Sequence, residues 1–196
     1  KVIKSYSDLD DMIKQIKEVN FFAFDTESRG LPWNKEPMLC MSFSVGMGRN
    51  WVLPVYQHQP NPDEDQWQLK PAWSGVELPV IFGNKLKELF ESDIPKAAHN
   101  IKYDMCVLRK HAGIEVKGFL FDTMLMHHIL CELYPHDLEY LARIEFAVGD
   151  YSHTLHQITG YGKELKRTYD WVPDEILWPY AATDAECCFR LAKLYY

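Results

Sequence analysis

The stretch Phe22-Ala23-Phe24-Asp25-Thr26-Glu27 places two carboxylates one residue apart at the end of an apolar run that begins at Asn20. In an extended strand alternate residues share a face, so the side chains of Asp25 and Glu27 point the same way. Two like charges this close repel each other unless a cation lies between them, and Mg²⁺ takes oxygen ligands of this kind. The alternative is a strand that runs into a polar turn. The metal interpretation therefore requires further carboxylates downstream.

Two later stretches supply carboxylates at helical spacing. Asn100-Ile101-Lys102-Tyr103-Asp104 opens a predicted helix, with Asn100 as its N-cap and Asp104 one turn further on. Tyr180-Ala181-Ala182-Thr183-Asp184 lies on the last predicted helix, where its first and last residues share one face. Taken singly, each motif also fits an ordinary helix whose acidic residue complements the dipole or faces solvent. The three motifs have to be weighed together.

The composition limits what the chain can be. Its 196 residues are 47% apolar, which suits one domain with a real core and argues against disorder. No apolar run is long enough to span a membrane, and no signal peptide opens the chain. The first residue is Lys1, so we expect residues 1–196 to be a single domain cut from a longer protein.

Cysteine usage and charge narrow the class of protein further. Five cysteines without CxxC spacing indicate reduced thiols in an intracellular compartment, not a zinc cluster or a disulfide frame. A net charge of −7 argues against a broad DNA clamp that ignores sequence. It is compatible with a nuclease, because the site of such an enzyme is itself acidic until metal binds.

Apolar periodicity predicts an α/β fold with a mixed sheet of about five strands flanked by helices. Strands are predicted at residues 20–26, 38–45, 50–55, 94–99 and 117–121, and the second and third form a hairpin. Helices are predicted at residues 7–19, with Ser7 as cap, and at 78–92, 100–111, 124–133 and from Pro173 onward. Residues 56–78 show no period and are predicted to be an insertion loop, and residues 150–171 to be short helices and loops.

The motifs resemble a known family when they are taken in order. Phe24-Asp25-Thr26-Glu27, Asn100 to Asp104, Phe121-Asp122-Thr123-Met124-Leu125 and Tyr180 to Ala185 are similar to the motifs of the DEDD exonucleases, which have an RNase H-like fold. The resemblance is closest to the 3′–5′ proofreading exonuclease domain of DNA polymerase I and other family A polymerases, and it covers nearly the whole chain. Each motif is weak singly, but the four in this order are strong.

The chain also departs from the family pattern in places. His99 stands where polymerase I commonly has Gln, and Pro135 stands where some relatives carry Arg. These departures affect residues that would contact substrate. They leave the carboxylates Asp25, Glu27, Asp104 and Asp184 of the motifs unchanged. The other large branch carries His five residues before the last Asp, but that position here is Pro179. The resemblance is therefore to the tyrosine branch, with Tyr180 in that role.

The resemblance implies a 3′–5′ exonuclease that releases nucleoside 5′-monophosphates from DNA by two-metal hydrolysis. The two ions would be Mg²⁺ or Mn²⁺, held by Asp25, Glu27, Asp104 and Asp184, with Asp25 shared between them. Tyr180 would orient the attacking water and complete the catalytic set. Substrate contacts are carried over to Thr26, Leu31, Asn100 and Tyr103, although Leu31 could equally be plain core.

The expected partners and the alternatives follow from the same resemblance. The substrate would be a single-stranded or frayed DNA 3′ end, a polymerase module would belong to the same chain, and no membrane would be involved. The compartment would be the cytoplasm of a bacterium or a phage-infected host. Two alternatives stay open. One is an RNA-processing or repair exonuclease of the same branch, since nothing in the sequence addresses the 2′-hydroxyl. The other is a non-catalytic nucleic-acid-binding domain of this fold.

Overall fold

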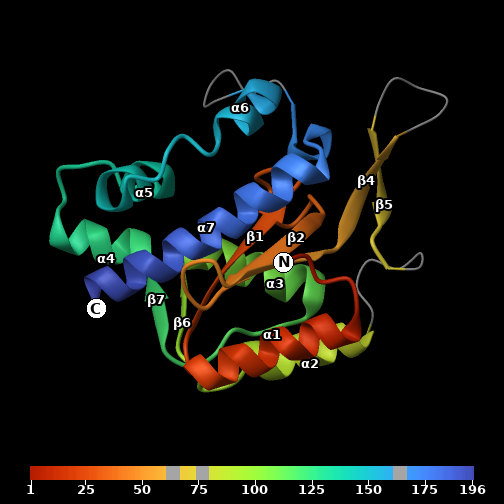
Figure 1. Ribbon diagram of the computed structural model, residues 1–196, viewed down its shortest axis with the longest axis horizontal. Helices are drawn as coiled ribbons and strands as arrows, with labels where there is room; N and C mark the ends of the chain where they lie inside the picture. Colours follow the sequence, from red (N-terminus) through yellow and green to blue (C-terminus); the bar gives the residue numbers. More distant parts are fainter. Residues whose placement is uncertain (61–66, 74–79, 161–166) are drawn as a thin grey trace.

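A computed structural model describes residues 1–60, 67–73, 80–160 and 167–196. Its centre is a five-stranded mixed sheet with the strand order β3-β2-β1-β6-β7, seen nearly edge-on in Figure 1. The strands are β1 (Phe22–Ser28), β2 (Met38–Ser44), β3 (Asn50–Pro54), β6 (Lys96–Ala98) and β7 (Leu120–Asp122). The β1–β2 and β2–β3 pairs are antiparallel, whereas β1–β6 and β6–β7 are parallel. The predicted fold class and the predicted hairpin are confirmed.

The central strand β1 is buried on both faces because its apolar residues do not alternate with polar ones. Phe22 and Phe24 point into a core that includes Phe43 and Phe90. Ala23 points to the other face, where it packs with Ala97 of β6. Large side chains therefore fill one side of the sheet, and small side chains on the other side allow a helix to approach closely.

Helices cover both faces of the sheet (Figure 1). On the face of Phe22 and Phe24 lie α1 (Tyr6–Val19), α2 (Val80–Phe90) and α3 (Ile101–Ala112). The long helix α7 (Asp174–Tyr195) crosses the opposite face and packs on β1, β2 and β3. Around α7 lie α4 (Thr123–Leu130), α5 (Leu138–Phe146) and α6 (His153–Thr159). None of the helices in the described part of the chain has the length and apolar character needed to cross a bilayer.

The prediction of an insertion loop at residues 56–78 is wrong for those of its residues that the structure describes. Residues on either side of 61–66 form an antiparallel pair, β4 (Tyr56–Pro60) with β5 (Trp67–Pro71), outside the main sheet. Its residues are mostly Gln, His, Lys and Pro, so a search for apolar alternation misses it. Residues 61–66 and 74–78 of the predicted loop lie outside the described residues.

Two predicted helix boundaries are also corrected. Helix α1 begins at Tyr6 and is capped by Ser5, whose Oγ accepts a hydrogen bond from the N–H of Asp8 at 3.2 Å, so Ser7 is not the cap. Helix α4 ends at Leu130, before the predicted end at residue 133. Between residues 150 and 171, helix α6 and the short turn η2 (Tyr169–Trp171) confirm the predicted short helices. Residues 161–166 of that segment are not described.

Candidate active site

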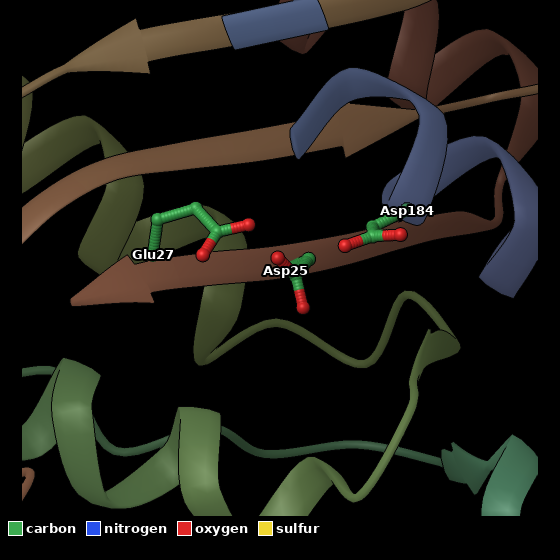
Figure 2. Close-up of side chains that lie close together, drawn as sticks. All are labelled: Asp25, Glu27 and Asp184. Atoms are coloured by element: carbon green, nitrogen blue, oxygen red, sulfur yellow. The ribbon is translucent and has the colours of Figure 1, made fainter. Parts of the chain in front are cut away.

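Three carboxylates meet between β1 and α7. Asp25 and Glu27 project from the same side of the strand, as predicted, and Asp184 faces them from the helix (Figure 2). One oxygen from each of the three lies within 4.8 Å of the others. Ala181 and Ala185 are fully buried on the same helix, and their small side chains let α7 approach the strand closely. The geometry is that of a candidate metal site.

Among the residues that the structure describes, the three carboxylates of this cluster have no positive charge beside them to compensate their negative charge. Burial raises the pKa of Asp25 to about 6. The pKa of Glu27 is raised well above its usual range by burial and then by the charge of Asp25, and that of Asp184 is raised for the same two reasons. Within the described residues, no ion pair joins any of the three to Lys, Arg or His. A divalent cation would supply the missing positive charge.

Asp104 lies beside this cluster without being part of it. The side chain is 2% exposed and reaches β1 from the first turn of α3. Its Oδ1 accepts hydrogen bonds from the backbone N–H of Thr26 at 2.9 Å and from the Thr26 hydroxyl at 2.7 Å. Burial, and then the charge of Asp25, raise the pKa of Asp104, so the two carboxylates interact electrostatically. The structure therefore groups the four predicted ligands as three plus one.

Helix α3, which carries Asp104, is not capped by Asn100 as predicted. Asn100 has a left-handed backbone (φ 57°), and its side chain makes no capping hydrogen bond. The cap comes from Asp122, whose carboxylate accepts from the N–H groups of Asn100 at 3.0 Å and Ile101 at 3.2 Å. Asp122 also accepts from the N–H groups of Met124 and Leu125, so it caps the start of α4 as well. One side chain thus fixes the starts of two helices.

Tyr180 lies one helical turn from Asp184 and belongs to a group of three tyrosines. Its ring stacks on Tyr151 at 5.7 Å between centroids and meets Tyr169 edge-on at 6.4 Å. The hydroxyl of Tyr151 donates a 2.5 Å hydrogen bond to Asp184 Oδ1. Burial and the nearby charges of Asp184 and Glu27 raise the pKa of Tyr180 well above 10, so its phenol stays protonated and can donate a hydrogen bond. Tyr151 and Tyr169 are not predicted from the sequence, because they lie in a segment without periodicity.

The predicted substrate residues lie on β1, on the loop that follows it and at the start of α3. Leu31 is 80% exposed, which excludes the core alternative for this residue. Tyr103 reaches the same loop, since its hydroxyl donates to the carbonyl of Gly30 at 3.3 Å. Thr26 is 5% exposed and its hydroxyl is engaged with Asp104. With Asn100 at the start of α3, all four residues remain predicted contacts.

The histidines form pairs elsewhere in the molecule. The ring nitrogens of His136 lie 2.7 Å from those of His127 and 2.9 Å from those of His128. His156 contacts Glu139 at 3.0 Å, and His153 lies 3.5 Å from Asp150. Over the described ranges, only the three carboxylates bring enough ligand atoms together for a metal ion.

The family described as 3′–5′ exonuclease matches residues 1–194 of the chain. Among curated proteins, DNA polymerase I of Chloroflexus aurantiacus is 29% identical over 192 residues, which is 98% of this chain and 19% of that protein. DNA polymerase I of Pseudomonas aeruginosa is 27% identical over 195 residues, 97% of this chain and 20% of that protein. The DNA polymerase of Escherichia phage T5 is 36% identical over 109 residues, 50% of this chain and 13% of that protein. The chain spans about a fifth or less of the length of these relatives.

Solved structures show the same fold. The complex of Trypanosoma brucei RNase D with RNA U12 has a TM-score of 0.69 and 15% identity, covering 100% of this chain and 61% of that one. Brucella melitensis NrnC with bound Mg²⁺ has a TM-score of 0.59 and 20% identity, covering 91% of this chain and 72% of that one. At these identities the likeness concerns the arrangement of the sheet and its helices.

Proposed function

The chain belongs to the 3′–5′ exonuclease family, and from that premise we propose that it removes nucleoside 5′-monophosphates from DNA 3′ ends as the proofreading domain of a family A DNA polymerase. The observation that carries the proposal is the meeting of Asp25, Glu27 and Asp184 in one cluster, in which Glu27 and Asp184 are buried and Asp25 is partly buried. The four carboxylates and the tyrosine expected of an active member are all present, which argues against a non-catalytic binding domain.

The cluster fits divalent cations. Its ligand atoms are hard carboxylate oxygens within 4.8 Å of one another. Burial raises the pKa of all three groups, and the charge of Asp25 raises the pKa of Glu27 and Asp184 further. We assign two Mg²⁺ or Mn²⁺ ions to the site. Asp25, Glu27 and Asp184 would hold one ion, and Asp25 and Asp104 would hold the other, with Asp104 acting directly or through water. Divalent ions of this kind supply water activation and charge neutralisation in phosphodiester hydrolysis.

The chain's own residues orient the reactants. Tyr180 keeps its proton because burial and neighbouring carboxylates raise its pKa, so it serves as a hydrogen-bond donor that positions the attacking water. Exposed Leu31 and the ring of Tyr103 contact the terminal bases, and stacking contributes about 1–3 kcal/mol per base whatever the sequence. Asn100 and Thr26 contact the terminal nucleotide.

The relatives support a proposal for the parent protein and its substrate. They are DNA polymerases about five times as long as this chain, so we propose a polymerase module in the same polypeptide. A frayed 3′ end reaches the site more readily than a paired one, because unpairing a base costs a few kcal/mol. We propose the cytoplasm of a bacterium or of a phage-infected host as its compartment, because the relatives come from bacteria and phages.

RNA is the second candidate substrate. The fold is shared with an RNase D whose structure contains RNA U12. Matched DNA and RNA oligonucleotides of one sequence separate the two candidates, because only RNA offers a 2′-hydroxyl. Under the proposal, DNA is degraded at least as fast as RNA.

The experiment is a ladder assay on 5′-labelled single-stranded DNA with Mg²⁺, Mn²⁺ or EDTA. We expect stepwise shortening from the 3′ end with either metal and none with EDTA, and faster loss of a mismatched 3′ end than of a matched duplex end. Full activity in EDTA would contradict the metal assignment. Equal rates on matched and mismatched ends would point to a general nuclease.

A further inference from the structure

Tyr151 lies outside every motif identified in the sequence, yet it contacts the acidic cluster directly. Its hydroxyl donates to Asp184 Oδ1 at 2.5 Å, across 33 residues of chain. Figure 2 shows one of the Asp184 oxygens turned toward Asp25. A hydrogen bond to a carboxylate fixes its rotation about the last side-chain bond, and so fixes which oxygen faces the other two acids.

The position of Tyr151 is supported by the structure around it. Its backbone N–H donates to the carbonyl of Gly149 at 2.8 Å in the turn that leads into α6. Helix α6 is anchored by Leu155, which is fully buried against Leu39 and Leu177. The Tyr151 ring stacks on Tyr180, with 29° between the ring planes. The hydroxyl is therefore held at Asp184 by the stack on Tyr180 and by the anchored helix that follows Tyr151.

We propose that Tyr151 is a positioning residue for the metal site, and that its hydroxyl holds the Asp184 carboxylate in the orientation a divalent cation needs. This inference rests on the proposed function for the role of Asp184 as a ligand. Hydrogen-bond partners of metal ligands typically change metal affinity or activity by about 10- to 100-fold when they are removed. Tyr180 also hydrogen-bonds Asp184, but its proposed role is to orient the attacking water, so Tyr151 is the tyrosine expected to act mainly on metal affinity.

Calorimetric titration of Mn²⁺ into the metal-free chain tests the inference without any turnover. Tyr151→Phe keeps the ring and its stacking but deletes the donor, so Mn²⁺ should bind about tenfold more weakly or worse. Tyr6→Phe is the matched control, since Tyr6 lies half-exposed on α1 against Phe82. Tyr6→Phe should bind Mn²⁺ like the wild type. Equal affinity in Tyr151→Phe and the wild type would overturn the inference.

A double substitution separates positioning from a general loss of structure. In an Asp184→Ala background the hydroxyl has no carboxylate to hold, so adding Tyr151→Phe should reduce residual Mn²⁺ affinity no further. An additional tenfold loss in that background would show that Tyr151 acts by another route and would overturn the assignment. Melting curves in EDTA accompany each variant, and Mn²⁺-induced stabilisation in those curves gives a second measure of affinity.

The metal dependence of hydrolysis distinguishes this inference from the proposed function. In Tyr151→Phe the Mn²⁺ concentration for half-maximal rate should rise about tenfold, while the rate at saturating Mn²⁺ stays within about threefold of wild type. A wild-type chain that binds Mn²⁺ but hydrolyses no nucleic acid would refute the proposed function. The Mn²⁺ affinity of Tyr151→Phe would still decide the role of Tyr151.

Discussion

Thr26 and Asp104 are joined by two hydrogen bonds to a single oxygen. The backbone N–H of Thr26 lies 2.9 Å and its hydroxyl 2.7 Å from Asp104 Oδ1, although the residues are 78 positions apart. Thr26 stands between Asp25 and Glu27 in the strand, so its side chain points to the opposite face, where α3 lies. The alternation that directs two acids toward α7 therefore directs the intervening threonine toward the fourth acid.

Replacing Thr26 by Val should weaken this link while keeping the shape of the side chain. We expect a loss of about 1–3 kcal/mol in the free energy of unfolding in EDTA, because a buried acceptor loses one of its two donors. Mn²⁺ binding should weaken as well, since Asp104 is less firmly held. Urea unfolding and calorimetry measure the two effects.

Thr159→Val is the matched control for that substitution. Thr159 is buried and its hydroxyl donates to the carbonyl of Leu155 at 3.1 Å, away from the acidic cluster. It should lose stability but keep its Mn²⁺ affinity. If both variants bind Mn²⁺ like the wild type, the Thr26–Asp104 link serves the fold alone.

Asp122→Ala should be more destabilising than the loss of an ordinary cap. Its carboxylate accepts four N–H groups at the starts of α3 and α4, whereas Asp137 accepts from Tyr140 at the start of α5. An ordinary cap contributes about 1 kcal/mol, so we expect about 2–3 kcal/mol for Asp122→Ala and about 1 kcal/mol for Asp137→Ala. Thermal unfolding in EDTA compares them. Equal losses would mean that one of the two helix starts is held by other groups.

The strands and the acidic motifs were predictable because their signals are local. Apolar runs identify β1 and the hairpin of β2 and β3, and fixed spacing places Asp25 with Glu27 and Tyr180 with Asp184 on common faces. In each case the residues that carry the signal lie within one helix or strand. Their periodicity is therefore enough to predict the element and the face on which its side chains lie.

The missed features depend on contacts between distant segments. Tyr151 meets Asp184 only after α6 has packed against the core, and no spacing within its own segment signals that contact. Asp122 reaches the start of α3 because β6 and β7 pair side by side. The β4–β5 ribbon lies outside the main sheet with polar residues on its strands, so local apolar alternation does not reveal it.

The raised pKa of Asp25 gives the metal-free chain a characteristic pH dependence. Its folded-state pKa of about 6 exceeds that of an unfolded aspartate, so the folded state binds more protons between about pH 4 and pH 6. Protonated Asp25 thus contributes to the free energy of unfolding at low pH, and this contribution is lost as pH rises through about 6, where the buried carboxyl ionises. In EDTA, Asp25→Asn should therefore melt a few degrees above the wild type at pH 7.5, and less so at pH 5.

Two comparisons check this assignment by thermal unfolding. Glu132→Gln, at an exposed position, should leave the melting temperature nearly unchanged at both pH values. Mn²⁺ at pH 7.5 should stabilise the wild type far more than Asp25→Asn, because the cation neutralises the charge that the substitution removes. A wild type that is more stable at pH 7.5 than Asp25→Asn in EDTA would contradict the raised pKa.

Leu31 is expected to act on the substrate and not on the fold. The side chain is 80% exposed, and Leu133 is an equally exposed leucine at 87% beyond the end of α4. Leu31→Ala should slow removal of 3′ nucleotides by about 3- to 10-fold, with stability and Mn²⁺ affinity unchanged, because a contact with the terminal base is lost. Leu133→Ala should cleave like the wild type. Equal rates for both variants would remove Leu31 from the substrate contacts.

Tyr180 and Asp184 share a helical face, but their substitution should have different effects on hydrolysis and on metal binding. Asp184→Ala removes a ligand from the cluster, so hydrolysis should nearly vanish and Mn²⁺ should bind more weakly in calorimetry. Tyr180→Phe deletes one hydrogen-bond donor and keeps the ring that packs between Tyr151 and Tyr169. The rate at saturating metal should fall about 10- to 1,000-fold, which corresponds to about 1–4 kcal/mol of positioning.

Metal affinity and melting temperature of Tyr180→Phe should stay close to those of the wild type, because no ligand and little packing is lost. Single-turnover cleavage of labelled DNA at saturating Mn²⁺ separates this loss of rate from any change in binding. Suppose that Tyr180→Phe cleaves as fast as the wild type while Asp184→Ala is inactive. The Tyr180 phenol would then serve packing alone, another group would orient the water, and the tyrosine-branch mechanism assigned to this site would be wrong.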